Sequence, residues 1–303
     1  MEIKVLRVDS PLMFDSPLTG SVKGEMSLME YPFFDLSKRG RTRAFAYDDG
    51  QVQITVRAPD GQIATIYDKD ILIYIASLMV AKMNEHETPP QTFTFTAHDY
   101  IRVTGKNASG RGYEQIVSAI ERLQGTQIKT NIETGGEGVT GFFSWLEKAD
   151  INYTVNKSKK RVMKSITVRL CDFIYRSILN DGHFLTYDPK YFDLSPLERR
   201  VYEIARKHCG HQDGFRIRLG KLHAKTGSES SLKLFKQNLN EISERDAIPE
   251  YHVGIVGDPR SPLTRRLEAI GFEQPKRRQR LNDLMVMIIP KNTAPTGHEL
   301  VVD

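Results

Sequence analysis

The pattern of apolar and polar positions is the same in two parts of the chain. Thr104-Gly105 and Thr226-Gly227 each close a short candidate helix, and a longer amphipathic helix follows each pair. The matching apolar residues after the two glycines are Tyr113, Val117 and Ile120 in the first copy and Phe235, Leu239 and Ile242 in the second. A helix, a turn with glycine and a second helix form the skeleton of a helix-turn-helix. The pattern therefore predicts two such units in one chain.

Before the first copy, the pattern predicts a hairpin and a helix. Asp49-Gly50 suits the positive backbone angles of a tight turn, which indicates a hairpin over residues 43–57. Asp68 is the expected N-cap of a helix that runs to Asn84. One face of this helix should be buried. The apolar residues on that face are Ile71, Leu72, Ile75, Leu78 and Met79.

Strands are predicted on both sides of each helix-turn-helix, and in the first copy the segments that follow it alternate between apolar and polar residues. In the first copy the predicted strands are within residues 93–95, 127–133, 139–155 and 161–170, and in the second copy 215–219, 251–257 and 284–290. A helix-turn-helix followed by a β-hairpin is a winged helix. Its second helix enters the major groove of DNA, and its wing contacts the backbone or the minor groove.

The predicted fold class is therefore α+β, with two tandem winged-helix domains. Residues 181–193 should form a loop between them, and Ser195, Pro196 and Glu198 have the spacing that starts a capped helix. The predicted divisions are a flexible N-terminal segment (1–24), a first winged-helix domain (25–188), a second winged-helix domain (189–291) and a frayed C-terminal tail (292–303).

Composition narrows the class of protein. With 303 residues, 39% of them hydrophobic and 27% charged, the chain is expected to form two globular domains, each with its own core. No apolar run reaches the roughly 18 residues that indicate a membrane span. The first residues lack the apolar core of a signal peptide, and two cysteines give no disulfide framework. These features favour a protein of the bacterial cytoplasm with no membrane partner.

The net charge of +5 is modest, but the basic residues are clustered. Such clusters are typical of segments that bind phosphate, although an ordinary solvated surface explains any single cluster as well. The cluster residues that we assign to DNA binding are Lys38, Arg39, Arg41 and Arg43, then Lys157, Lys159, Lys160 and Arg161, and then Arg260, Arg265, Arg266, Lys276, Arg277 and Arg278.

The longer helix of each copy has polar and basic residues opposite its apolar face. Arg and Lys bond guanine, Gln and Asn bond adenine, and serines and free N–H groups at a helix start suit phosphate. The alternative is that these residues only form the solvated face of a core helix. The candidate contacts are Lys106, Asn107, Ser109, Arg111 and Gln115 in the first copy, and Ser228, Ser230, Ser231, Lys233, Lys236 and Gln237 in the second.

Motifs for catalysis are weak. The segment from Gly214 to Lys221 has one residue too many for a P-loop. His208 and His211 lack both the spacing of a zinc finger and a second pair of ligands. The tyrosines considered as nucleophiles, which no neighbour in the sequence activates, are Tyr31, Tyr153 and Tyr187. We therefore expect a protein that is not an enzyme, with no catalytic residue, metal or cofactor.

Four segments carry recognisable motifs: MEYPFFDLSKRGRT, YDKDILIYIASLMVAKMN, GRGYEQIVSAIERLQGTQIKTNI and DLSPLERRVYEIARKH. They resemble the plasmid replication initiator protein A family, the RepA-type initiators of broad-host-range plasmids, which are similar in plan to TrfA. The resemblance extends over residues 25–290. The motifs of the first predicted domain are the more specific ones.

The resemblance implies two winged-helix domains that bind direct repeats, called iterons, in a plasmid origin as duplex DNA. It implies that binding helps to open an adjacent AT-rich segment and recruits the host initiator and the replicative helicase. It also implies that a homodimer can repress its own promoter, and that single-stranded AT-rich DNA is a further partner.

The residues themselves leave other functions open. A winged-helix transcriptional repressor binds duplex DNA in the same way, so the sequence does not separate it from an initiator. A DNA-nicking enzyme is disfavoured because no metal or tyrosine site is visible. A scaffold that binds only protein is the remaining class.

Overall fold

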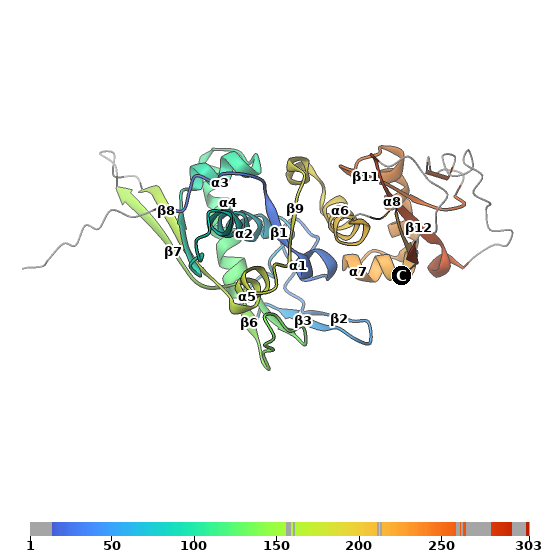
Figure 1. Ribbon diagram of the computed structural model, residues 1–303, viewed down its shortest axis with the longest axis horizontal. Coiled ribbons are helices and arrows are strands. Elements are labelled where there is room, and N and C mark those ends of the chain that lie inside the picture. Colours follow the sequence, from blue (N-terminus) through green and yellow to red (C-terminus); the bar gives the residue numbers. More distant parts are fainter. Residues whose placement is uncertain are drawn as a thin grey trace, which may run out of the picture.

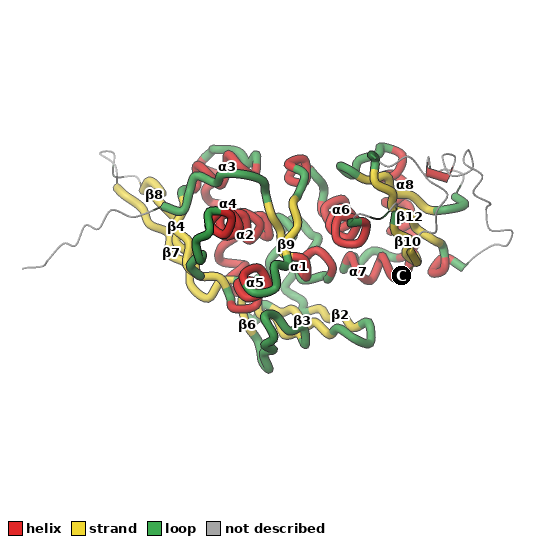
Figure 2. The backbone as a smooth tube through the Cα atoms, viewed as in Figure 1, coloured by secondary structure: helices red, strands yellow, loops and turns green. Residues whose placement is uncertain are grey.

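A computed structural model describes residues 14–155, 159, 161–210, 212, 214–258, 261, 263–264, 280–292 and 301–302. Its buried apolar side chains form two large clusters, which lie toward opposite ends of an elongated molecule (Figures 1 and 2). The first cluster is built from residues between Leu18 and Ile178, and the second mainly from residues between Tyr187 and Ile288. Helices and strands contribute to both, so the fold is mixed α and β.

Six elements around the first cluster follow the order that the sequence predicts. Their strands pair in the order β4-β8-β7, so the strand before the two helices lies beside the second strand of the hairpin. We call these elements the first module. They are α2 (Lys69–Asn84), β4 (Thr92–Phe95), α3 (Ala97–Thr104), α4 (Gly110–Gly125), β7 (Leu146–Val155) and β8 (Arg161–Leu170).

Six elements around the second cluster repeat this arrangement, and we call them the second module. Their strands pair in the order β11-β12-β10, which again places the strand before the two helices beside the second strand of the hairpin. The elements are α6 (Pro196–Cys209), β10 (Phe215–Arg218), α7 (Leu219–Thr226), α8 (Leu232–Glu244), β11 (Tyr251–Ile255) and β12 (Met285–Pro290).

The repeated helix, glycine turn and helix of the sequence is confirmed in both modules. α3 and α7 have eight residues each, and Gly105 and Gly227 follow them with φ of 66° and 72°. This left-handed backbone is favourable for glycine and costly for other residues, which explains why Thr-Gly closes both helices. α4 and α8 then begin at the same distance from the two glycines.

A second sheet extends the first module. The hairpin predicted over residues 43–57 is present, and its turn is held by the carboxylates of Asp48 and Asp49, which accept hydrogen bonds from N–H groups within the turn. The strands of this sheet pair in the order β2-β3-β5-β6. They are β2 (Phe45–Asp48), β3 (Gln53–Arg57), β5 (Gln127–Thr130) and β6 (Phe143–Ser144).

The segments that join the modules are more ordered than the sequence predicts. Residues 181–193, expected to be a loop, contain a strand that pairs antiparallel with one near the N-terminus. The expectation of a flexible segment is also wrong for residues 14–24, since Leu18 N donates to Asp99 Oδ2 at 2.8 Å; residues 1–13 lie outside the described part. The joining elements are β1 (Lys23–Glu25), α1 (Met26–Glu30), α5 (Asp172–Leu179), β9 (Phe184–Thr186) and the 3-10 helix η1 (Pro189–Asp193).

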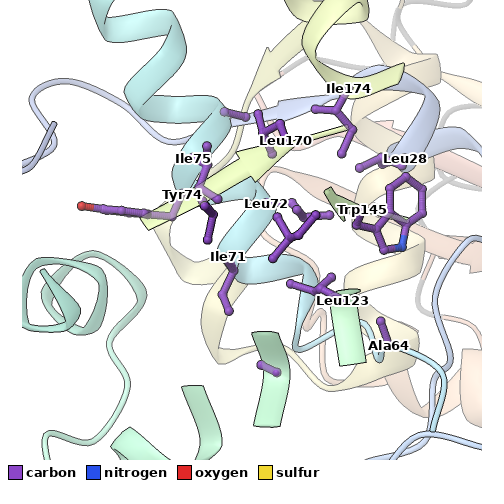
Figure 3. Packing of buried hydrophobic residues seen from close by; sticks show 14 of the residues in the cluster. Leu28, Ala64, Ile71, Leu72, Tyr74, Ile75, Leu123, Trp145, Leu170 and Ile174 are labelled. Atoms are coloured by element: carbon purple, nitrogen blue, oxygen red, sulfur yellow. The ribbon is translucent and has the colours of Figure 1, made fainter. Parts of the chain in front are cut away.

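The helix α2 is buried on all sides for most of its length, where the sequence predicted one buried face. Its residues from Lys69 to Val80 are all buried. Both clusters surround it, because Ile71 and Leu72 pack in the first cluster and Ile73 packs in the second. Figure 3 shows Ile71, Leu72 and Tyr74 pointing away from α2 in different directions, with Trp145 in the same core.

The predicted bounds of the helix from Asp68 to Asn84 are confirmed, but the contacts at its start and the structure of the C-terminal tail differ from the expectation. Asp68 precedes α2 but makes no capping hydrogen bond to it. Its carboxylate instead accepts a hydrogen bond from Thr65 N at 2.7 Å and pairs with Arg122. At the other end of the chain, the expected frayed tail contains β13 (Val301–Val302), which pairs in parallel with β10. A short 3-10 helix, η2 (Leu281–Asp283), precedes β12.

Candidate nucleic-acid interface

The first turn of α4 lies at the surface of the first module. Ser109 caps the helix, because its hydroxyl accepts a hydrogen bond from Gly112 N at 3.3 Å. Position 112 requires glycine, since a Cβ there would lie 2.0 Å from the carbonyl oxygen of Asn107. Asn107, Arg111 and Gln115 are exposed at this end of the helix. The buried residues of the opposite face are Gly112, Ile116, Ala119, Ile120 and Leu123.

The first turn of α8 is built in the same way. Ser231 caps the helix, and its hydroxyl accepts a hydrogen bond from Leu234 N at 3.3 Å. Ser228 and Ser230 hydrogen-bond each other at 3.0 Å in the preceding turn. The exposed residues of the first two turns are Lys233, Leu234 and Gln237. Each module therefore exposes the capped start of one long helix, where free N–H groups and the helix dipole favour anions.

Leu234 belongs to this exposed surface, and the sequence reading missed it. Its side chain is 46% exposed, whereas the neighbouring Phe235 is fully buried. One residue corresponds to a rotation of about 100° around a helix, so the position of Leu234 relative to Phe235 was the signal that could have found it.

The outer faces of the two helices also carry acidic residues that the sequence reading left out. Glu114 and Glu121 are exposed on α4, and Glu241 and Glu244 on α8. Carboxylates repel the phosphates of DNA. Glu121, Glu241 and Glu244 therefore disfavour DNA contact toward the helix ends, whereas Glu114 lies beside Gln115 at the start of α4 and reduces the net positive charge there.

Two lysines assigned to DNA binding are ion-paired within the protein. Lys106 Nζ lies 3.0 Å from Asp70 Oδ2 and donates to the Tyr100 hydroxyl at 2.7 Å. Burial alone would lower the pKa of Lys106, but Asp70 and Tyr100 outweigh it and raise the pKa. Lys236 Nζ lies 2.8 Å from Asp258 Oδ2. Each lysine would have to exchange a partner in order to bind DNA.

The basic loop over residues 37–43 lies between the two helix starts. Arg41 Nε lies 3.0 Å from Asp35 Oδ1, and its Nη1 pairs with Glu229 in the turn before α8. Gly40, at φ +82°, packs so closely that a Cβ would lie 2.4 Å from the Ile63 carbonyl oxygen. The basic residues that this loop leaves exposed are Lys38, Arg39 and Arg43.

A cavity of 360 Å³ lies beside the loop, and Lys38 lines it together with residues of the first module. The other polar residues around it include Lys106, Asn107, Gln115 and Arg122. The structure thus brings Lys38 close to the start of α4, although the sequence separates them. Predicted contacts from two different clusters therefore share one surface.

The β7–β8 hairpin projects from the first module (Figure 1). Lys159 is exposed at its end, and the exposed apolar residues Tyr153, Val155 and Val162 lie on its strands. The side chain of Arg161 lies outside the described part of the chain. The other predicted contacts that fall outside it are Lys157, Lys160, Arg260, Arg265, Arg266, Lys276, Arg277 and Arg278. Arg260 to Arg278 belong to the connection between β11 and β12, which pair as a hairpin.

The residues considered for catalysis have other surroundings. The His208 ring stacks on Phe215 with ring centroids 4.5 Å apart, and Tyr187 is buried and donates to Glu203. Among the residues that the structure describes, no group of three or more His, Cys, Asp and Glu side chains could hold a metal ion. Within the same residues, no helix is both long enough and apolar enough to cross a membrane.

Solved structures of other proteins have a similar fold. Two structures of domains 2 and 3 of RctB align with TM-scores of 0.57 and 0.52, each at 14% sequence identity. The first alignment covers 87% of this chain and 96% of that chain, and the second covers 86% and 94%. The Pi initiator protein in complex with iteron DNA aligns at 15% identity with a TM-score of 0.47, over 75% of this chain and 91% of that chain. At these identities, the two RctB structures show a shared fold only.

Sequence comparison gives the family. A "Putative replication protein" of Wigglesworthia glossinidia brevipalpis is 35% identical over 249 residues, which cover 79% of this chain and 86% of that protein. The family model of replication initiator protein A matches residues 23–253, from β1 to β11. The resemblance found in the sequence is therefore confirmed, and the chain belongs to the replication initiator protein A family and is a replication initiator.

Proposed function

We propose that the protein initiates plasmid replication by binding direct repeats of the origin as duplex DNA, with α4 and α8 each in a major groove. The observation that carries this proposal is the repeated module, in which each long helix buries one face and exposes its capped start. In this proposal both modules are winged helices. The first domain would span residues 25–188 and the second residues 189–291, although Met29, Ile73 and Tyr187 pack in the second hydrophobic cluster.

The exposed helix starts support recognition of duplex DNA. Arg111 and Lys233 can bond guanine, while Asn107, Gln115 and Gln237 can bond adenine. The N–H groups at the two capped helix starts suit phosphate. The β7–β8 hairpin would be the first wing, and the basic connection between β11 and β12 the second.

The two modules would contact successive major-groove turns, which lie about 34–36 Å apart along the DNA axis. A repeat of roughly 20 base pairs is therefore expected. Opening of an AT-rich segment and recruitment of the host initiator and the replicative helicase would follow binding, and family membership supports these later steps. We propose no catalytic step for this chain. Family membership also supports a cytoplasmic site of action and a homodimer that represses its own promoter, and we propose both.

A footprint on the DNA that flanks the gene tests the proposal. We expect protection of repeated sequences, and binding to them that is much tighter than to random duplex at physiological salt. Lys233→Glu should weaken this binding, whereas Lys190→Glu, which reverses an exposed lysine of η1, should not. Equal affinity for the repeats and for random duplex would refute the proposal. A plasmid that replicates only when the gene is supplied in trans separates an initiator from a repressor.

A further inference from the structure

A group of buried charged side chains lies between the two modules. It contains two residues of α2 and three residues of α6, and none of their side chains is more than 2% exposed. We call it the inter-module charge cluster, and its members are Lys69, Asp70, Arg199, Arg200 and Glu203. Charged groups lose their hydration when buried, so a group of this size needs well-formed partners.

Glu203 is the centre of one half of the cluster. Its carboxylate lies 2.7 Å from Lys69 Nζ and pairs with Arg200. It also accepts hydrogen bonds from the hydroxyls of Tyr191 at 2.6 Å and Tyr187 at 3.2 Å. Burial opposes the charge on Glu203, but Lys69 and Arg200 outweigh it and hold the pKa of this carboxyl below its usual value. An ionised glutamate of the second module is therefore bound by a lysine of the first.

Asp70 is the centre of the other half. Its Oδ1 accepts a hydrogen bond from Arg199 Nη1 at 2.6 Å, and its Oδ2 lies 3.0 Å from Lys106 Nζ. Lys106 belongs to the turn that leads into α4, and Arg199 belongs to α6 of the second module. Asp70 thus links the turn before the first candidate DNA-reading helix to the second module.

The end of α7, which leads into the turn before α8, is bonded to Arg200 of the cluster and to the joining helix α1. Arg200 Nη2 donates to the carbonyl oxygen of Lys225, in the last turn of α7, at 3.0 Å. Arg200 Nη1 donates to the carbonyl oxygens of Leu28 and Met29 in α1, each at 3.1 Å. Lys225 Nζ lies 2.9 Å from Glu30 Oε1, also in α1. The turn before α4 is therefore linked to the second module through Asp70, and the end of α7 is linked through Arg200 and Glu203 to Lys69 of the first module.

We infer that the inter-module charge cluster fixes the separation and orientation of α4 and α8, and thereby the spacing of the two DNA segments that the protein recognises. Apolar contacts are non-directional and tolerate sliding, whereas paired charges with several hydrogen bonds accept few arrangements. These residues are positioning residues, since none of them is placed at the DNA. The inference rests on the proposed function, because it concerns the spacing of the sequence that the two helices read.

Spacing on DNA is a sensitive readout of such positioning. One inserted base pair moves the second segment by about 3.4 Å along the axis and rotates it by roughly a tenth of a turn. A protein with fixed modules cannot follow this change, so its second module loses contacts. A protein whose modules can shift would retain part of them.

The experiment measures affinity for a footprinted repeat and for versions with one base pair inserted or deleted between the two protected segments. The first variant is Lys69→Met with Glu203→Gln, which removes one charge of each sign and keeps an acceptor for the tyrosines. The second is Asp70→Asn, which covers the case in which the first does not fold. For the wild type we expect a loss of at least about tenfold per inserted base pair, similar to the cost of a mismatched base. For the variants we expect each inserted base pair to reduce the affinity by less than about threefold.

Asp99→Asn is the matched control. Asp99 is a buried carboxylate that accepts hydrogen bonds from Leu18 N and the Tyr74 hydroxyl inside the first cluster, away from the boundary. It should lower stability without changing the spacing profile. Folded cluster variants that keep the wild-type spacing penalty would overturn the inference, and so would a wild type that is indifferent to spacing. Absence of any preference for the repeat would instead refute the proposed function.

Discussion

The exposed leucine at the start of α8 gives the sharpest prediction about sequence recognition. Leu234 lies in the first turn of α8, after the N-cap residue Ser231 and before the candidate contact Gln237. An apolar side chain in the major groove has one natural partner, which is the C5-methyl group of thymine. We therefore predict that Leu234 packs against a thymine methyl in the repeat, and that Leu234→Ala removes the preference for thymine at one position.

The magnitude follows from the area that remains to be buried. Leu234 is 46% exposed in the free protein, so about half of its side chain can still lose contact with water on binding. Full burial of a leucine contributes about 1.5–3 kcal/mol, so the exposed half should contribute roughly 1 kcal/mol. Removing the thymine methyl alone should cost about 0.8 kcal/mol, the value of one buried carbon. That corresponds to roughly a fourfold loss of affinity per site.

The assay replaces each thymine of the repeat in turn by deoxyuridine, which lacks only the methyl group. Binding of the wild type and of Leu234→Ala is measured for every duplex by fluorescence anisotropy. At one position the wild type should lose about fourfold and the variant should lose almost nothing, which is the signature of two groups in contact. If every deoxyuridine has the same effect on both proteins, Leu234 does not contact a thymine methyl and the reasoning is wrong.

Four further predictions concern stability and charge. Gly105→Ala should lower the free energy of unfolding by about 1–2 kcal/mol, because alanine is strained in the left-handed backbone at this position. Gly227→Ala should lower it more, since the added Cβ would also lie 2.7 Å from Pro32 Cβ. Thermal melts of the two variants test this order. The fold lowers the pKa of Glu203 from 4.5. The ionised carboxylate therefore stabilises the folded protein above pH 4.5, and this stabilisation is lost as the pH falls through the pKa of Glu203 in the folded protein. Denaturation curves should therefore show a steeper loss below pH 4.5 in the wild type than in Glu203→Gln. Lys38→Ala should weaken binding to all DNA sequences alike and reduce the slope of log K against log salt by about 1.

Much of the fold could be predicted from the sequence because its signals are local. The serine caps of α4 and α8, the glycines after α3 and α7, and the turn at Asp49-Gly50 each act within a few residues. The strand before each short helix was also found from its alternation. These signals give the ends of elements, and the order of the elements then restricts the topology.

The predictions that differ from the structure concern elements that form or are buried through contacts with residues distant in the sequence. The strand β9 exists because it pairs with β1, and β13 because it pairs with β10. The all-round burial of α2 comes from two clusters that meet on it, and the almost continuous apolar run from Ile71 to Val80 was a sequence signal of this burial that the one-face prediction did not use.

The candidate interface was predicted in part for the same reason. Exposure of Arg111 and Gln115 follows from the helical period, and the structure agrees; Asn107, which is also exposed, lies in the turn before α4. The partners of Lys106 and Arg41 do not follow from it, because Asp70 and Glu229 reach them only through the tertiary fold. A basic residue can therefore be proposed from the sequence to bind phosphate, but only the tertiary structure shows whether an acidic residue of the protein already pairs with it.

The inter-module charge cluster shows where the family motifs act. Three of the four family-like segments meet at the boundary between the modules, since they contain Glu30, then Lys69 and Asp70, and then Arg199, Arg200 and Glu203. In the sequence these charges resemble the solvated face of amphipathic helices, but the fold buries them against one another. These three segments therefore supply the charges that we infer to fix the relative placement of the modules.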